Sequence, residues 1–323
     1  MSIERNLTDK VTAMTKNGET PGATAETDAF DKKRPLTISQ IRASTRNKKV
    51  LKRGGSYLFL LAGAITMVAP FLWMLTTSLK EPGAVFSFQK NWWEEWLPFS
   101  FHWENYVKAW HVVPFGRFYL NSIFVAVCVT AAQVLTSAMA AYSFARLNFP
   151  GRDKIFFGYL ATMMVPGAVT MIPVFILLRY LGWIDTYKAM ILPAAFTAYG
   201  TFMLRQFFLT LPKDLEDAAK IDGCSYFRIF WQIILPLSKP ALATLTTFTF
   251  MGTWMSFMWP LIVMNTHEKF TLPIGLAYFQ SLHGTNWTYL MAGSMMMILP
   301  ILLVFIFNQR FFVEGIKLSG IKG

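Results

Sequence analysis

"FYLNSIFVAVCVTAAQVLTSAMAAYSF", residues 118–144, contains no Asp, Glu, Lys or Arg over its whole length. As an α-helix at about 1.5 Å per residue, this stretch would be about 40 Å long, which exceeds the roughly 30 Å hydrocarbon core of a bilayer. A helix of this length on the surface of a soluble protein would carry charged residues on its exposed face. The stretch is therefore predicted to be a transmembrane helix.

Five further windows are apolar in the same way; four lack Asp, Glu, Lys and Arg, and the one at 187–208 carries Lys188 and Arg205 near its ends. Together with the first, the predicted spans are residues 57–78, 118–144, 155–178, 187–208, 240–263 and 287–307. The composition agrees, because 54% of the 323 residues are hydrophobic and only 15% are charged. Prolines fall inside most spans and are expected to kink them, namely Pro70, Pro166, Pro173, Pro193, Pro260 and Pro300. The predicted fold class is an all-α membrane protein with six transmembrane helices.

The basic residues are distributed unequally between the two sides that six spans would define. Twenty-three of the 30 Lys and Arg residues fall on the side that holds both termini, so the positive-inside rule predicts cytoplasmic termini. The net charge of +12 is then explained by topology, and no nucleic-acid partner is expected. Residues 1–54 are predicted to form a largely disordered, basic cytoplasmic tail beside anionic lipid, and residues 55–323 the transmembrane domain.

The spans contain no ionisable residue in their cores. Ion-coupled carriers keep such residues in the membrane despite their cost of about 2.5–3.5 kcal/mol each, so a carrier or channel is disfavoured. No phosphate-binding loop, catalytic cluster or metal-ligand pattern is evident, which also disfavours a membrane enzyme. If the protein drives a solute uphill, the energy must come from another subunit.

The loop at residues 210–237 is long, predicted cytoplasmic and helical in pattern. Acids at positions 214, 216 and 217 suit the positive end of a helix, Gly223 is expected to end it, and Ser225 to cap a second helix. Leu215, Ala218, Ala219 and Asp222 would share one small, lightly apolar face. That face suits the groove of another protein, although a surface hairpin without a partner has the same pattern.

This loop resembles the EAA loop of binding-protein-dependent ABC importer permeases, E-A-A-x3-G-x9-I-x-L-P. Asp217, Ala218, Ala219, Gly223, Ile233, Leu235 and Pro236 match the pattern in spacing, with Asp217 in place of the usual Glu. In that family the loop is the coupling helix that seats in the cytoplasmic ATPase. The resemblance therefore implies that coupling is carried by Glu216, Asp217, Ala218, Ala219, Asp222, Gly223, Leu235 and Pro236.

From about residue 55 onward, segments such as "AAYSFARLNFPGRDKIF" (140–156) and "FTLPIGLAYFQ" (270–280) resemble the carbohydrate branch, the maltose-type second permease. The resemblance implies a type I importer permease fold in a bacterial inner membrane. It also implies three kinds of partner: a second permease, two ABC ATPase subunits that hold ATP and Mg²⁺, and an extracytoplasmic sugar-binding protein. This chain would bind no cofactor itself and catalyse no reaction. The expected function is a permease subunit of an ATP-driven sugar importer, with a sugar phosphate or another small polar solute as the alternative cargo.

Sugars bind to aromatic faces and hydrogen-bonding side chains, and the fifth span supplies both. Candidate substrate-path residues are Thr253, Trp254, Ser256, Phe257 and Trp259, with membrane packing as the alternative role for Trp259. The branch usually has W-N-D/E-F where this chain has "WMSF" (254–257), so Met255 and Ser256 replace an asparagine and an acid there. The next loop resembles the family's external loop, and Phe279, Gln280, His283 and Asn286 are candidate contacts of the binding protein.

Overall fold

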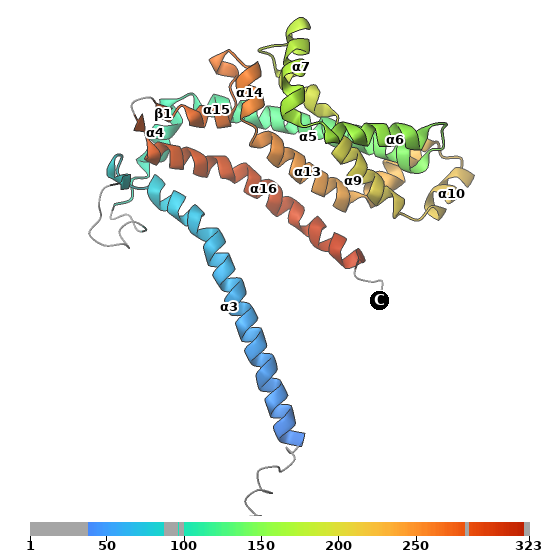
Figure 1. Cartoon of the computed structure of the whole chain (residues 1–323), viewed down its shortest axis with the longest axis horizontal. Helices are drawn as coiled ribbons and strands as arrows, with labels where there is room; N and C mark the ends of the chain where they lie inside the picture. The colour runs from blue at the N-terminus through green and yellow to red at the C-terminus, as the bar shows by residue number, and fades with distance from the viewer. Residues whose placement is uncertain (1–37, 87–95, 97–99, 282–283, 320–323) are drawn as a thin grey trace, which may run out of the picture. The chain divides into compact units, whose positions relative to one another are not determined.

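The computed structural model describes residues 38–86, 96, 100–281 and 284–319, and most of these residues are helical. The α-helices are α3 (Ile38–Ser78), α4 (Glu104–Val112), α5 (Phe115–Arg146), α6 (Arg152–Ala161), α7 (Gly167–Tyr180), α8 (Tyr187–Ile191), α9 (Ala198–Leu209), α10 (Asp214–Ile221), α11 (Tyr226–Ile229), α12 (Leu235–Leu237), α13 (Lys239–Trp254), α14 (Met258–Val263), α15 (Leu272–Ala277) and α16 (Trp287–Ser319) (Figure 1). Single helical turns of other types are η2 (Ala84–Phe86), η4 (Thr162–Met164), η5 (Pro193–Ala195), the π-turn η6 (Phe230–Ile234) and η7 (His267–Lys269). Strands β1 (Gln280–Ser281) and β2 (Gly284–Thr285) form one short antiparallel pair.

The chain divides into two compact units, Met1–Ala69 and Pro70–Gly323. The described part of the first unit belongs to α3, which is apolar from Arg53 to Ser78 and has no buried residue from Arg53 to Ala69. Of the predicted tail, residues 1–54, positions 1–37 lie outside the described residues. From Ile38 it is helical, so the predicted boundary at residue 54 lies inside α3.

Within the described residues, three helices are long and apolar enough to cross a membrane: Arg53–Ser78, Phe115–Arg146 and Trp287–Phe311. Two bent helix pairs raise this number to five if each pair counts as one span. The chain is therefore a helical membrane protein with three to five candidate spans by length and composition. The predicted spans at 155–178, 187–208 and 240–263 are not continuous helices.

The predicted span 155–178 is interrupted at residues 165–166. Helix α6 with η4 and helix α7 meet there at 99°. Val165 has φ −82° and ψ 117°, because the ring of Pro166 excludes the helical conformation from the residue before it. Pro173, by contrast, lies inside α7 without ending it.

The predicted span 187–208 consists of α8, η5 and α9, with extended backbone at Phe196 and Thr197. Pro193 has no N–H to donate to the carbonyl of Ala189, four residues earlier. The Trp259 indole Nε1 donates to that carbonyl instead, at 3.0 Å. A tertiary contact thus satisfies the group that the proline leaves free.

The predicted span 240–263 ends its first helix at Trp254 and starts a second at Met258. A continuous helix would place the ring of Pro260 against the carbonyl of Ser256. In the structure Pro260 instead lies in the first turn of α14, where a missing N–H costs little. The break therefore lies beside the predicted substrate-path residues.

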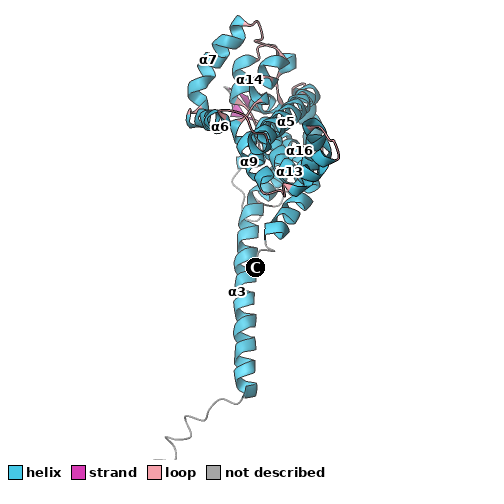
Figure 2. Ribbon diagram, turned by 90° about the vertical axis from the view of Figure 1, so that its right-hand side faces the viewer, coloured by secondary structure: helices cyan, strands magenta, loops and turns pink. Residues whose placement is uncertain are grey.

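Helix α5 is the central element of the second unit. It packs against α9 and α13, and α13 packs in turn against α16 (Figures 1 and 2). Gly200 of α9 permits the approach to α5, because a Cβ there would lie 2.6 Å from the Ser137 hydroxyl oxygen. Two apolar clusters pack along α5. One lies around Phe118 and Trp254, and the other around Tyr142, Phe208 and Ile229.

The loop before α8 is fastened to the loop after α14 by Asp185, which has a positive φ of 60°. Its carboxylate accepts from the backbone N–H groups of Asn265 (3.0 Å) and Thr266 (2.9 Å), from the Thr266 hydroxyl, and from Lys269 Nζ (3.0 Å). Burial raises the pKa of the Asp185 carboxyl, but these hydrogen bonds outweigh it and hold the pKa well below its ordinary value. Asp185 is therefore ionised at neutral pH and joins the two loops.

Candidate functional site

Helix α10, the predicted coupling helix, is folded by local signals in its own sequence. Its first turn carries the three acids at 214, 216 and 217, and it begins at Asp214, two residues after Pro212. It ends at Ile221, and Gly223, two residues further on, has a φ of +79°, which is favourable only for glycine. The amide of Cys224 closes the end by donating to the Ala219 carbonyl at 2.9 Å.

The next helix also begins as predicted. The Ser225 hydroxyl accepts from the Arg228 amide at 3.4 Å, as an N-cap does. The helix widens into the π-turn η6 shortly before Pro236. Pro236 has no N–H to donate to the carbonyl of Gln232, four residues earlier. Leu235 packs against the second apolar cluster, whereas Pro236 is exposed.

The two faces of α10 have opposite environments. Leu215 is 45% exposed, Ile221 is 87% exposed, and Ala218 and Asp222 are also exposed. Ala219 is buried against the second apolar cluster, so it does not lie on the free face where the sequence pattern placed it. An apolar side chain as exposed as Ile221 on a short, otherwise polar helix leaves a surface available to a partner.

Glu216 is the other buried residue of α10, and its partner is Arg146 at the end of α5. Arg146 Nε lies 2.9 Å from Glu216 Oε1, as an ion pair without the alignment of a hydrogen bond, and the two side chains are 3% and 6% exposed. Arg146 Nη2 also donates to the carbonyls of Phe208 (2.6 Å) and Leu211 (2.7 Å), where α9 ends. One guanidinium thus holds the ends of α5, α9 and α10 together. Glu216, assigned to coupling by the family resemblance, therefore faces Arg146 inside the chain.

Asp217, the acid of the EAA pattern, faces solvent. Its carboxylate accepts from Lys220 Nζ at 3.0 Å within the helix, and the two side chains are 62% and 42% exposed. The hydrogen bond from Lys220 to Asp217 raises the pKa of the lysine. Because both side chains of this pair are exposed to solvent, the pair is weak, and Asp217 can exchange Lys220 for another cation at low cost.

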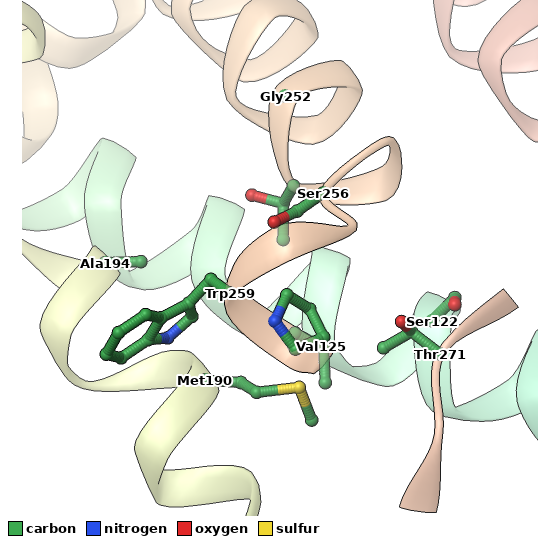
Figure 3. A pocket seen from close by; sticks show the side chains of 10 residues that line it. Ser122, Val125, Met190, Ala194, Gly252, Ser256, Trp259 and Thr271 are labelled. Carbon is green, nitrogen blue, oxygen red and sulfur yellow. The ribbon is translucent and has the colours of Figure 1, made fainter. Parts of the chain in front are cut away.

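The break between α13 and α14 borders a cavity of about 150 Å³ (Figure 3). Of the predicted substrate-path residues, Thr253, Ser256 and Trp259 line it. They are joined by residues of α5, α8 and the loop before α15, among them Ser122, Met190 and Thr271. At about 30 Å³ per molecule, such a cavity holds about five waters.

The other two predicted substrate-path residues lie elsewhere. Trp254 is 1% exposed, stacks on Phe250 and donates from its indole to the Met297 carbonyl at 3.0 Å. It is part of the first apolar cluster, so its ring is not accessible to a solute in this conformation. Phe257 is 38% exposed and does not line the cavity.

The predicted contacts of a binding protein are dispersed. Phe279 is buried in the first apolar cluster, so it does not present its ring at the surface. Gln280 is exposed on β1. Asn286 is exposed and its side-chain oxygen accepts from the Tyr289 amide at 3.1 Å, at the start of α16. His283 lies outside the described residues.

Sequence reasoning missed Arg146, Ser122 and Thr271. Arg146 follows directly on a predicted span and was counted only as a topological charge. Ser122 and Thr271 are far apart in sequence and meet only through the fold, where the Ser122 hydroxyl accepts from the Leu272 amide at 2.7 Å. Their hydroxyls give no periodic signal that could have marked them.

Comparison with known proteins gives consistent results. A family described as "Binding-protein-dependent transport system inner membrane component" matches residues 133–313. The arabinooligosaccharides transport system permease protein AraQ of Halalkalibacterium halodurans is 41% identical over 203 residues, which cover 63% of this chain and 73% of that protein. The sn-glycerol-3-phosphate transport system permease protein UgpE of Yersinia pestis is 34% identical over 228 residues, covering 68% and 81%.

A solved structure resembles the fold. One chain of a bacterial ABC transporter involved in the import of the acidic polysaccharide alginate superposes with a TM-score of 0.73 at 24% identity. The match covers 83% of this chain and 98% of that chain. At this identity the likeness concerns the fold alone.

Proposed function

Because the chain belongs to the family of binding-protein-dependent transport system inner membrane components, we propose that it is a permease subunit of an ATP-driven sugar importer. It is a membrane-embedded transport subunit. A bacterial inner membrane is the proposed location, and the named relatives are from bacteria.

The observation that carries the proposal is the arrangement of α10. Its free face, with Ile221 87% exposed and Asp217 on the surface, is free to contact another protein. Its opposite face is fixed to α5 and α9 through the buried Arg146–Glu216 pair. A displacement of α10 by a partner would therefore move two membrane helices rather than bend a flexible loop.

The proposed partners follow from the energy source. The cores of its predicted spans offer no ionisable residue for ion coupling, so the energy would come from two ABC ATPase subunits that bind ATP and Mg²⁺. A second permease would complete the pathway, and an extracytoplasmic binding protein would deliver the cargo, as the family's name indicates. No cofactor is proposed for this chain.

The proposed mechanism is alternating access. Closure of the ATPases would push α10, and Arg146 would pass this movement to the ends of α5 and α9. The helices on either side of two interrupted spans, α6 with α7 and α13 with α14, would then change their arrangement around the cavity at Thr253, Ser256 and Trp259. ATP hydrolysis would reset the cycle, and this chain would not alter the cargo chemically.

The test is ATP-driven uptake by the chain co-expressed with its partners and reconstituted in proteoliposomes. Asp217→Lys should abolish uptake and the stimulation of ATPase activity, because it places a cation where a cation of the partner is expected. Asp153→Lys is the matched control, since Asp153 is also an exposed acid in a first helical turn with a basic neighbour at 3.1 Å. The proposal fails if no ATPase co-purifies, or if both variants transport like the wild type.

A sugar phosphate or another small polar solute is the second candidate cargo. The 34% identity to UgpE, which is named for sn-glycerol-3-phosphate, supports a sugar phosphate as a candidate cargo. The same uptake assay with labelled glycerol 3-phosphate distinguishes it from a neutral sugar.

A further inference from the structure

Two cavities adjoin along one side of α13. The first is the cavity of about 150 Å³ at the break between α13 and α14. The second, of about 300 Å³, is lined by residues of α5, α9 and α13, including Gln133, Tyr199 and Thr249. Gly252 and Thr253 line both, so the two spaces meet at these residues.

The described side chains that line the two cavities carry no charge. Their polar groups are hydroxyls and one amide, from Ser122, Thr253, Ser256 and Thr271 in the first cavity and Gln133, Tyr199 and Thr249 in the second. An anionic group that entered would lose its hydration without meeting a cation on these walls, which is strongly unfavourable.

Several of these polar groups have no partner within the described part of the chain. The Thr271 hydroxyl is the clearest case, because the residue is only 4% exposed and its oxygen makes no hydrogen bond there. Figure 3 shows Thr271 and Ser122 together at one side of the cavity, with Ser256 on the neighbouring wall. Buried polar groups are normally paired, so an unpaired one on a cavity wall indicates a missing polar ligand.

Aromatic rings supply the apolar part of the surface. The Trp259 ring is fixed in orientation by its hydrogen bond to the Ala189 carbonyl, which leaves its face, and not its N–H, available to the cavity. Tyr199 and Phe248 line the second cavity. Rigid aromatic faces among hydroxyl and amide groups suit the C–H faces and hydroxyl edges of sugar rings.

We propose that these two adjoining cavities form one subsite, contributed by this chain, for an uncharged carbohydrate. A sugar ring lies against Trp259, and its hydroxyls bond to Thr271, Ser256 and Gln133. This inference rests on the proposed function and narrows its cargo to neutral saccharides, in preference to sugar phosphates and uronic acids. It also assigns Gln133 and Tyr199 to the pathway.

Gly252 provides a test of the shared space. A Cβ at this position meets no atom within 4 Å, so Gly252→Leu should fold normally while its side chain fills the junction. Gly158→Leu is the matched control, because Gly158 lies in α6 and is equally unobstructed. We expect at least a tenfold loss of uptake for Gly252→Leu, with assembly of the complex retained, and near wild-type uptake for the control. Equal uptake by both variants would overturn the inference.

The charge of the cargo is tested by uptake in proteoliposomes that hold the complete transporter and its binding protein. The probes are labelled maltotriose, arabinotriose and diacetylchitobiose as neutral saccharides, and glycerol 3-phosphate and trigalacturonate as anions. Uptake of a neutral probe, with a roughly two- to tenfold higher KM in Thr271→Val, supports the inference. Thr271→Val keeps the shape of the side chain and removes no hydrogen bond of the described chain, so it should not impair folding.

The outcomes separate the two proposals. ATP-driven uptake of the anions alone, or an unchanged KM in Thr271→Val, overturns the neutral subsite and leaves the importer function intact. Absence of ATP-driven uptake for every probe, with the partners present, contradicts the proposed function and the inference with it.

Discussion

Replacement of Arg146 by alanine should destabilise the chain more than replacement of any exposed arginine. The Arg146 and Glu216 side chains are 3% and 6% exposed, so Arg146→Ala leaves a buried carboxylate without its partner. Loss of one member of a buried ion pair costs about 3–5 kcal/mol. The carbonyls of Phe208 and Leu211 also lose their donor, and this loss overlaps with the first rather than adding to it.

The assay is denaturant titration of the purified full-length chain in detergent micelles, together with ATPase activity of the assembled complex. Arg152→Ala is the control, because Arg152 pairs with Asp153 at 3.1 Å at the surface and should contribute between about 0 and 1 kcal/mol. Arg146→Ala should lower the free energy of unfolding by about 3–5 kcal/mol and reduce stimulated ATPase activity to the basal rate.

A double variant tests whether the loss of stability comes from the unpaired buried charge. Arg146→Met with Glu216→Leu removes both charges and should recover most of the lost stability, since a buried apolar pair of similar volume is often neutral or stabilising. Arg146→Lys keeps the charge but loses the planar fork that reaches three acceptors, so an intermediate value is expected. If Arg146→Ala matches Arg152→Ala, or if the double variant is as unstable as the single one, the buried-pair reasoning is refuted.

Three further predictions concern single sites. Gly223→Ala should destabilise the chain by about 1–2 kcal/mol, because φ +79° is unfavourable for alanine, whereas Gly252→Ala should be neutral or stabilising in a thermal melt. Gly200→Ala should cost about 1–3 kcal/mol by forcing α9 away from Ser137, and a tolerated Gly200→Ala would contradict the close approach of the two helices. Asp185→Asn should cost about 1.5–3 kcal/mol near neutral pH. The pKa of Asp185 is lower in the folded chain than its ordinary value of 3.8, so the carboxylate stabilises the fold above pH 3.8, and this stabilisation is lost as the pH falls below that value. The difference in Tm between wild type and Asp185→Asn should therefore be constant from pH 5 to 8 and shrink only below about pH 3.8.

Local signals were sufficient where short-range chemistry decides the structure. Gly223 ends α10 and Ser225 caps the next helix, as the sequence predicts, because each acts on neighbouring backbone groups. Pro166, Pro193 and Pro260 lie where predicted spans break, whereas Pro70, Pro173 and Pro300 lie inside continuous helices. A proline alone therefore predicts neither a break nor how far the chain turns. The bend at Pro166 depends on packing beyond the two residues that the proline restricts.

Long-range pairing explains what could not be predicted. Sequence periodicity placed Ala219 on the exposed face, and it gave no sign that Glu216 is buried, since acids are almost never buried unless they are paired. Glu216 is buried because Arg146, 70 positions earlier, reaches it across the helix ends. Likewise, the sequence indicated a substrate contact or membrane packing for Trp259. Its hydrogen bond to the Ala189 carbonyl could not be predicted, because that carbonyl is left free by Pro193 in another part of the chain.

The central claim is that α10 delivers force from a cytoplasmic ATPase, and its most direct test is the accessibility of Ile221. This residue is 87% exposed in the chain alone. In a variant with Ile221→Cys, and with Cys128 and Cys224 replaced by serine, the rate of maleimide labelling is measured for the isolated chain, for the assembled complex and in intact cells. The account predicts rapid labelling of the isolated chain, at least tenfold protection in the complex, and no labelling by an impermeant maleimide from outside intact cells. Equal rates in chain and complex, or labelling from outside, would contradict it.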